Sequence, residues 1–210
     1  MPTPTSRSPV SAGSPCTPTS RRSRPSRAEV SCPRHPGAPA RLTRVLDDAR
    51  IRRYRDTDAR VTRSIFERAV RVTAAADYTA EQLAAWVPED RADTVLDDWA
   101  ARRAAVTTWV AELDDSVVGF TDLDVKIGYL DMLFVDPDAG RRGVGSALIR
   151  HVLDEARAVG LREVTVQASR TAQPVFARHG FVVVREQRVE RRGVLIENAV
   201  MRIPLDAPAG

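Results

Sequence analysis

Apolar residues recur at helical spacing in three stretches of the first half of the chain, after a short strand-like run. The run 50–55 (RIRRYR) is predicted to form an edge strand, and the run 56–58 (DTD) is typical of a helix N-cap. The inward face of that first helix follows the helical period and comprises Val61, Ile65, Ala69 and Val72. The run 79–82 (TAEQ) is a capping box for a second helix that ends at Pro88, and a third helix is predicted over 92–104.

The second half of the chain has the pattern of strands around one long helix. Strands are predicted over 107–113 and 117–123, and a continuous apolar strand over 129–135 (YLDMLFV). The helix predicted over 144–159 is amphipathic, with an inward face of Leu148, Ile149, Val152, Leu153, Ala156 and Val159. The remaining elements are a strand over 162–168, a short helix over 172–179, and strands over 181–188 and 194–203. This order predicts an α/β fold, with a central mixed sheet of about seven strands flanked by helices.

Residues 1–46 lack this periodic pattern and are predicted to be a disordered leader. They are rich in Pro, Ser and Arg, with nine prolines in the first 44 residues and no aromatic residue before Tyr54. Such a composition buries too little apolar surface to offset the entropy of ordering. Three interpretations stay open: a basic arm for nucleic acid, an unstructured extension, or an over-long gene model whose true start lies near Val45. We expect one folded domain over 47–206 and a tail over 207–210.

The charge of the chain is divided unevenly between these segments. The formal net charge is +4 and the isoelectric point is about 9.6, which at first indicates a nucleic-acid binder. Residues 1–44 hold eight Arg against the single acid Glu29, which gives +7, and the remaining 24 basic and 27 acidic residues give −3. The basic character therefore belongs to the leader, and nucleic acid is not the expected partner of the domain.

Composition excludes several kinds of chemistry from the predicted domain. No apolar run approaches the roughly 18 residues of a membrane helix, so a membrane-spanning function is excluded and a cytoplasmic location is expected. Cys16 and Cys32 both lie in the leader, so the domain has no cysteine nucleophile, thiolate metal site or disulfide. Its two histidines, His151 and His179, make a histidine metal centre unexpected. His151 shares a helix face with acidic residues and is expected to be exposed.

The segment 129–148 carries the clearest chemical signal, because a strand passes through a charged, glycine-containing loop into the amphipathic helix. The loop residues follow in the order Arg141, Arg142, Gly143, Val144, Gly145 and Ser146. Glycines let the backbone approach a ligand, and a helix N-terminus beside arginines favours negative charge, so this loop is predicted to bind a diphosphate. It has no Lys for a P-loop and no third glycine for a dinucleotide fingerprint.

This loop resembles the acetyl-CoA signature of the GNAT acyltransferase superfamily, in which Gln/Arg-x-x-Gly-x-Gly/Ala follows a strand ending in Val-x-Pro. The matching residues are 135–137 (VDP), Gly143 and Gly145. Downstream, 169–181 (SRTAQPVFARHGF) is similar to the family's Asn-x-x-Ala-x-x-x-Tyr-x-x-x-Gly-Phe segment. The resemblance covers about residues 49–205. The helix at Tyr78 and the ending RVERRGVLIENAVM are similar to a bacterial subgroup whose substrates are mostly unassigned.

The resemblance implies the GNAT fold, acetyl-CoA as co-substrate, no metal, and direct transfer of an acetyl group to a primary amine. The residues that it assigns to acetyl-CoA are Leu133, Phe134, Val135, Arg141, Arg142, Gly143, Val144, Gly145, Ser146, Ser169 and Phe176. Three positions depart from the family pattern. Gly140 stands at the Gln/Arg position, Ser169 at the Asn position, and Phe176 at the Tyr position that protonates the leaving thiolate in many members. The usual acid is therefore missing.

Asp131 is the predicted catalytic base, because it is the acid inside the apolar run 129–135, just before the cofactor segment. A part-buried carboxylate there would suit a base near neutrality. The other interpretation is that Asp131 is simply satisfied by a neighbouring backbone group or arginine, in which case Glu112 on an adjacent strand is the next candidate. Tyr78 is the predicted acid or substrate contact, with Tyr129 as the other available phenol.

These observations predict an N-acetyltransferase that acts on a small-molecule or peptide amine. Two other functions stay open. One is an acyl-CoA-binding regulatory protein with weak catalysis, which Phe176 favours, and the other is a nucleic-acid-binding protein that acts through the leader. The sequence identifies neither the amine acceptor nor whether the chain forms a homodimer.

Overall fold

The computed structural model describes residues 49–87 and 93–205, so the predicted leader, the predicted tail and Pro88 lie outside the described residues. The strands are β1 (Arg50–Arg53), β2 (Thr107–Leu113), β3 (Ser116–Leu123), β4 (Tyr129–Leu130), β5 (Leu133–Val135), β6 (Glu163–Ser169), β7 (Val182–Arg191) and β8 (Val194–Pro204). The α-helices are α1 (Ala59–Arg68), α2 (Ala80–Trp86), α3 (Asp93–Ala105), α4 (Val144–Ala158) and α5 (Gln173–Arg178). Short helical turns are η1 (Asp56–Asp58), η2 (Ala69–Thr73), η3 (Ala74–Ala76) and η4 (Pro137–Ala139). None of the described helices is long and apolar enough to cross a membrane.

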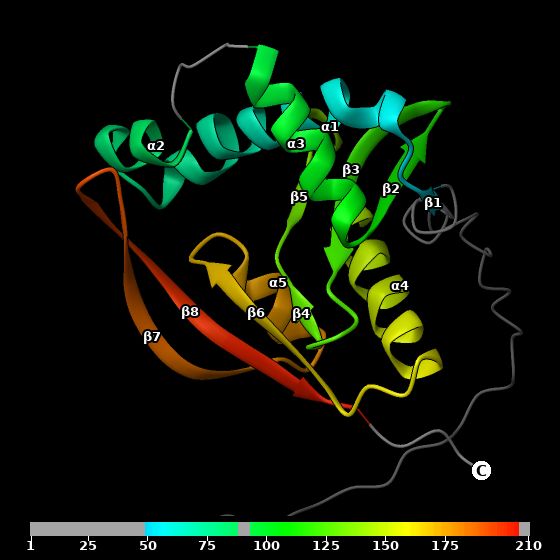
Figure 1. The fold of residues 1–210 in the computed structure, drawn as a ribbon. Coiled ribbons are helices and arrows are strands. Elements are labelled where there is room, and N and C mark those ends of the chain that lie inside the picture. The colour runs from blue at the N-terminus through cyan, green and yellow to red at the C-terminus, as the bar shows by residue number, and fades with distance from the viewer. Residues whose placement is uncertain (1–48, 88–92, 206–210) are drawn as a thin grey trace, which may run out of the picture. The chain divides into compact units, whose positions relative to one another are not determined.

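The strands form two four-stranded sheets (Figure 1). The first is antiparallel with the order β1-β2-β3-β5, and the second has the order β4-β6-β8-β7. In the second sheet β4 and β6 are parallel, and the other pairs are antiparallel. The predicted mixed α/β class with flanking helices is confirmed. The continuous strand predicted over 129–135 is wrong, because the strand breaks after Leu130 and its two halves, β4 and β5, join different sheets.

Helices cover both faces of the first sheet, because alternate residues of its strands point to opposite sides. Val110 and Phe120 pack with α1 and α3 in one core cluster, and Ala111 packs with α4 in another. Helix α4 lies so close to β3 that a Cβ atom added at Gly119 would come 3.1 Å from Val144 Cγ1. The start of α4, which carries the candidate diphosphate loop, is therefore held firmly against the sheet.

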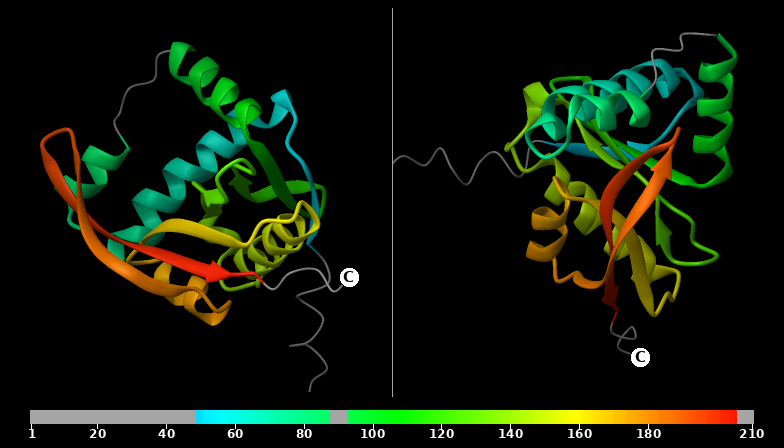
Figure 2. Two further views of the ribbon diagram at one scale, coloured as in Figure 1. Left: turned by 60° about the horizontal axis from the view of Figure 1, so that its bottom comes forward. Right: turned by 90° about the vertical axis from the view of Figure 1, so that its left-hand side faces the viewer.

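Helix α2 lies against the tip of the long β7–β8 hairpin, as the views in Figure 2 show together with Figure 1. The Gln82 side-chain amide donates to the carbonyl oxygen of Leu195 on β8 at 2.9 Å. The predicted capping box at the start of α2 is confirmed, since Gln82 N donates to Thr79 Oγ1 at 3.2 Å and Thr79 N donates to Gln82 Oε1 at 3.0 Å. These contacts attach the helix to the tip of the hairpin, which borders the site.

Three side chains lie differently from their predicted positions. Val72 is exposed, because the π-helical turn η2 widens the helix and moves the inward position to Val70. Val159 is exposed because α4 ends before it. His151 is half-buried rather than exposed, with its ring centroid 5.2 Å from that of Trp109, and burial lowers its pKa.

Candidate functional site

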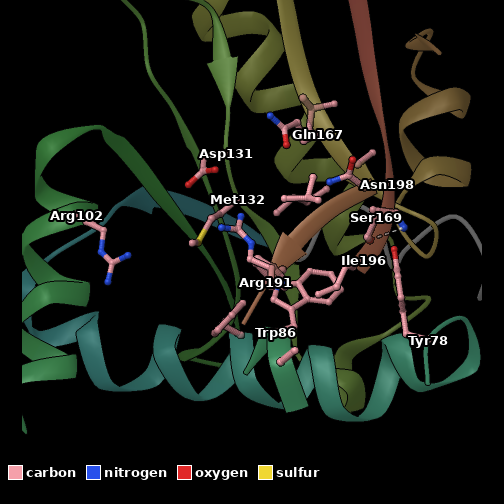
Figure 3. A pocket seen from close by; sticks show the side chains of 18 of the residues that line it. Tyr78, Trp86, Arg102, Asp131, Met132, Gln167, Ser169, Arg191, Ile196 and Asn198 are labelled. Atoms are coloured by element: carbon pink, nitrogen blue, oxygen red, sulfur yellow. Dashed lines mark hydrogen bonds between the residues drawn. The ribbon is translucent and has the colours of Figure 1, made fainter. Parts of the chain in front are cut away.

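The two sheets separate where β4 ends, and this separation creates the site. Strand β4 pairs with β6 only at Tyr129 and Leu130, after which the chain leaves β6 and β5 pairs with β3. Within the described residues, β5 is then an edge strand, and the stretch of β6 at Gln167–Ser169 has a strand partner only on its β8 side. A cavity of about 650 Å³ lies here, with lining residues from β5, β6, α2, α3 and the β7–β8 hairpin (Figure 3).

The backbone of β5 presents unpaired polar groups toward this gap. Asp122 N donates to the carbonyl oxygen of Met132 at 3.2 Å, and Asp136 N donates to that of Val118 at 2.8 Å. Because every second residue of an antiparallel strand bonds to a given neighbour, the N–H and C=O groups of Leu133 and Val135 point to the other edge, away from β3. That edge can pair with an extended ligand that carries amide groups.

The break in the strand is held by the buried carboxylate of Asp122 on β3. Its Oδ1 accepts hydrogen bonds from the amides of Asp131 at 3.0 Å and Met132 at 2.9 Å. Its Oδ2 forms an ion pair with Arg103 of α3, and both side chains are almost fully buried. Burial raises the pKa of Asp122 to about 6, while Arg103 and the two amides act in the opposite direction. This pair is not among the predicted site residues, although Asp122 is an acid within the apolar run of β3, which is a signal of the same kind as Asp131.

Asp131 lies in the break between β4 and β5 and lines the cavity (Figure 3). Its side chain is 53% exposed, with Oδ2 3.8 Å from Arg103 Nη2, so the expectation of a part-buried carboxylate is wrong. The break turns this residue out of the sheet, which a continuous strand would not do. The alternative candidate, Glu112, accepts from Arg52 Nε at 2.6 Å and is not among the residues that line the cavity. Of the two predicted carboxylates, the cavity therefore contains Asp131.

The two phenols of the cavity differ in what their hydroxyl groups bind. The Tyr78 hydroxyl donates to the carbonyl oxygen of Glu197 at 2.6 Å and accepts from the amide of Arg170 at 2.8 Å, and burial raises its pKa. It joins β8 to the loop after β6. The Tyr129 hydroxyl has no hydrogen-bond partner among the described residues, and burial together with the nearby charge of Asp131 raises its pKa to about 12. Tyr129 thus carries the freer phenol.

The loop that precedes α4 has the geometry of an anion site. Gly143, the N-cap residue, has φ +83°, and Arg141 has φ +59°, so the chain passes through two left-handed positions. In the described part of the chain, the first hydrogen bond of the helix is donated by Ala147 to Gly143, and the amides of residues 143–146 have no acceptor. Both Arg141 and Arg142 are exposed.

Gly140 and Gly145 are glycines for different structural reasons. A Cβ at Gly145 would meet only Val135 Cγ2, at 3.7 Å, so the protein itself leaves room for a side chain there. A Cβ at Gly140 would come 2.9 Å from the carbonyl oxygen of Pro137, so the tight turn η4 excludes the Gln or Arg of the family pattern. Gly145 therefore leaves space that no described residue fills, whereas Gly140 is required by the turn.

The other predicted cofactor residues divide between the cavity and the loop. Leu133, Phe134, Ser169 and Phe176 line the cavity, and Val135 lies at the end of β5 next to the loop. Ser169 Oγ accepts a hydrogen bond from the amide of Ala172 at 3.2 Å. The hydroxyl group of this short side chain thereby fixes the start of α5. Phe176 is buried, with its ring centroid 5.0 Å from that of Phe181. No cluster of three or more metal-ligating side chains occurs in the described residues.

Comparison with known proteins gives one consistent family. Residues 74–203 match the family model described as an acetyltransferase (GNAT) domain. The uncharacterized N-acetyltransferase YafP of Escherichia coli (strain K12) is 39% identical over 157 residues, which cover 75% of this chain and 97% of that protein. A GCN5-related N-acetyltransferase structure from Rhodopseudomonas palustris has a TM-score of 0.71 and 34% identity, and the match covers 76% of this chain and 98% of that one. The yncA structure from Salmonella typhimurium, solved with its cofactor acetyl-CoA, has a TM-score of 0.57 and 22% identity, over 78% and 98% of the two chains.

Proposed function

The chain belongs to the GNAT acetyltransferase family, and from this premise we propose that it transfers an acetyl group from acetyl-CoA directly to a primary amine. The observation that carries the proposal is the pair of facing free strand edges, on β5 and β6, that leads to the glycine-containing loop before α4. An extended amide-bearing arm fits the first feature, and a diphosphate fits the second. Acetyl-CoA contains both in one molecule.

The two ends of acetyl-CoA would be held by different forces. The pantetheine arm would pair with the outward N–H and C=O groups of Leu133 and Val135, as an additional strand would. The diphosphate would accept from the free amides at the start of α4 and from Arg141 and Arg142, where the helix dipole adds to the positive charge. The space at Gly145 supports this arrangement, because it lets the ligand approach the backbone closely.

Asp131 is the group best placed to prepare the acceptor. We assign it the role of base: its exposed carboxylate faces the cavity and takes one proton from the bound ammonium group. The neutral amine nitrogen then forms a bond to the thioester carbonyl carbon, the carbon–sulfur bond breaks, and the sulfur leaves as a thiolate. The nitrogen, now positively charged, releases its second proton to water, which leaves the neutral amide. Positioning of the two reactants in one cavity supplies much of the rate enhancement.

Tyr129 is the better candidate to give the thiolate its proton. Phe176, at the family's Tyr position, has no proton to donate, and the proton of Tyr78 is already donated to the carbonyl oxygen of Glu197. Tyr129 lines the same cavity two residues before Asp131, and its hydroxyl has no hydrogen-bond partner among the described residues. We therefore assign Tyr78 to positioning the wall of the cavity and Tyr129 to the proton transfer.

The test of the proposed function is the substitution Asp131→Asn, with Asp154→Asn as the matched control. Asp154 is a highly exposed carboxylate on α4 that does not line the cavity. We expect Asp131→Asn to lower kcat by roughly 10²- to 10⁴-fold, with acetyl-CoA binding unchanged and the acid limb of the kcat/KM profile removed. An acid limb that persists in Asp131→Asn would exclude this residue as the base.

Phe176 favours a second candidate function, an acyl-CoA-binding regulatory protein. Such a protein would bind CoA but would not accelerate thioester aminolysis. Measuring CoA binding by calorimetry and thioester turnover with a panel of amines on the same sample separates the two. Tight binding with no turnover by any amine would support the regulatory function.

A further inference from the structure

The charged side chains of the cavity wall are mostly cationic. Four arginines line the cavity, and they are Arg63, Arg102, Arg191 and Arg192. Against them stand only two carboxylates, those of Asp98 and Asp131. A site that prepares a cationic ammonium group for reaction would ordinarily be acidic, because like charges repel an incoming cation. The excess of arginine therefore needs an anionic partner.

Two of these arginines already have acceptors in the protein. Arg63 Nε donates to Glu67 at 2.7 Å, and Arg192 Nη1 donates to the carbonyl oxygen of Ala85 at 3.1 Å. The other two are Arg102 and Arg191. Arg102 uses only its Nε, which donates to the Asp98 carbonyl oxygen at 3.2 Å.

Arg191 at the end of β7 has no acceptor among the described residues, and no described carboxylate lies within ion-pair distance of Arg102 or Arg191. In the close view Arg191 extends from the end of β7 into the cavity beside Met132, and Arg102 projects from α3 on another side of the view (Figure 3). The positive charge of Arg191 also acts on the Tyr129 phenol, so it lies near the reacting end of the cavity.

These cations are separate from the predicted diphosphate site. The loop residues 141–146 do not line the cavity, and they follow the far end of β5 from Asp131. Arg102 and Arg191 line the same cavity as Asp131. The free arginines therefore belong to the part of the cavity that receives the acceptor.

The volume and the apolar wall restrict the acceptor further. A cavity of about 650 Å³ must hold the acetyl end of the co-substrate as well as the acceptor, which leaves room for a small molecule. Besides these charged groups, the wall of the cavity contains the apolar side chains of Trp86, Met132 and Ile196. A ligand that matches these three kinds of group has an ammonium group, a short apolar body and one anionic group.

We propose that the acceptor is a small amino carboxylate with an apolar side chain, whose carboxylate is bound by Arg191 and Arg102 while its amine faces Asp131. A guanidinium binds a carboxylate through two parallel hydrogen bonds, which orients the molecule as well as holding it. Polyamines and aminoglycosides, which carry several positive charges, are excluded from this site by the same arginines. This proposal rests on the proposed acetyl transfer and names the substrate class of that reaction.

The experiment compares L-leucine, L-methionine and L-phenylalanine with the amides of the same three amino acids, and with spermidine. Each amino acid should give a kcat/KM at least tenfold above that of its amide, and spermidine should give the lowest value. In Arg191→Gln and Arg102→Gln, the KM for the amino acids should rise roughly 10- to 100-fold and the preference over the amides should disappear, with the KM for acetyl-CoA unchanged. Arg185→Gln, on β7 outside the cavity, is the matched control and should match the wild type.

A second measurement does not depend on turnover. The N-acetyl derivatives of the same three amino acids and of their amides are titrated into the CoA-bound protein by calorimetry. Binding of the acids that is lost in Arg191→Gln supports the proposal. Faster acetylation of the amides or of spermidine, or no binding of any of the three acids, overturns it. If the other amines are acetylated instead, and Asp131→Asn still lowers their kcat, the proposed acetyl transfer remains supported although the substrate class is wrong. If the protein binds CoA but acetylates no amine, the proposed acetyl transfer itself is overturned.

Discussion

Removal of the Asp122 carboxylate should destabilise the protein strongly, because this one side chain is the partner of a buried guanidinium and of two part-buried amides. Asp122→Ala leaves Arg103 as an uncompensated buried charge, and breaking a buried pair in this way typically costs about 3–5 kcal/mol. The amides of Asp131 and Met132 lose their acceptor, although both residues border the cavity and water can replace it there. We therefore expect the free energy of unfolding to fall by about 4 kcal/mol.

The assay is urea unfolding followed by tryptophan fluorescence, with the slope m compared between variants. Asp122→Asn keeps an oxygen for the two amides, but it turns an NH2 donor toward Arg103 and leaves that buried charge uncompensated, so a loss of about 3 kcal/mol is expected. Asp154→Ala, on the surface of α4, serves as the control and should change the free energy of unfolding by less than about 1 kcal/mol. A loss below about 1 kcal/mol in Asp122→Ala, at an unchanged m, would refute the reasoning.

A paired replacement separates stability from activity. Asp122→Leu combined with Arg103→Leu removes both charges, and such apolar replacements of buried pairs are often neutral for stability. The amides of Asp131 and Met132 would still lack their acceptor, so the break in the strand would no longer be fixed. We expect the free energy of unfolding to recover in the double variant while acetyl transfer does not.

Three further predictions concern the loop, pH and the leader. Gly145→Val should raise the KM for acetyl-CoA at least roughly tenfold, because the ligand can no longer approach the backbone closely. The Tm should not change, because only Val135 lies near the added Cβ atom. An unchanged KM would exclude close approach of a ligand there. Burial lowers the pKa of His151 from 6.5, so the unfolded chain binds the proton more readily and the free energy of unfolding decreases as the pH falls below about 6.5. When the free energy of unfolding is measured against pH, it should decrease less steeply at acid pH in His151→Gln than in the wild type. A chain that begins at Val45 should keep its Tm and activity, because the Pro-, Ser- and Arg-rich sequence before it has no core-forming apolar pattern, and a fall of more than a few degrees in calorimetry would contradict this.

Elements with a strong local pattern could be predicted from the sequence. The bounds predicted for β2 match the structure, and those of α4 differ by one residue, because each has an unbroken period and a clear turn or glycine at its end. The loop 141–146 could be predicted as a candidate site for the same reason, since its glycines, its arginines and the helix start are adjacent in the chain. Such signals need no knowledge of distant residues.

The break at Asp131 could not be predicted in this way. The run YLDMLFV has a good local strand pattern. It is divided by the carboxylate of Asp122 on β3, which accepts a hydrogen bond from the Asp131 amide, nine residues later in the chain. The role of Tyr78 was equally hidden, because the partners of its hydroxyl, Glu197 and Arg170, are 119 and 92 residues away. Both features depend on tertiary contacts that override local preference.

The two free strand edges also link the stability of the protein to the concentration of the ligand that binds between them. In the described chain, β5 and the end of β6 face each other without a strand between them, and β4 joins the two sheets through a break of only two residues. A pantetheine arm bound there would close the gap between the sheets, so its binding energy would add to that of folding. At a free concentration one hundred times the Kd, such linkage contributes about 2.7 kcal/mol. A cell short of CoA in all its forms would then hold less of this protein in the folded state, because free CoA and acetyl-CoA carry the same pantetheine arm.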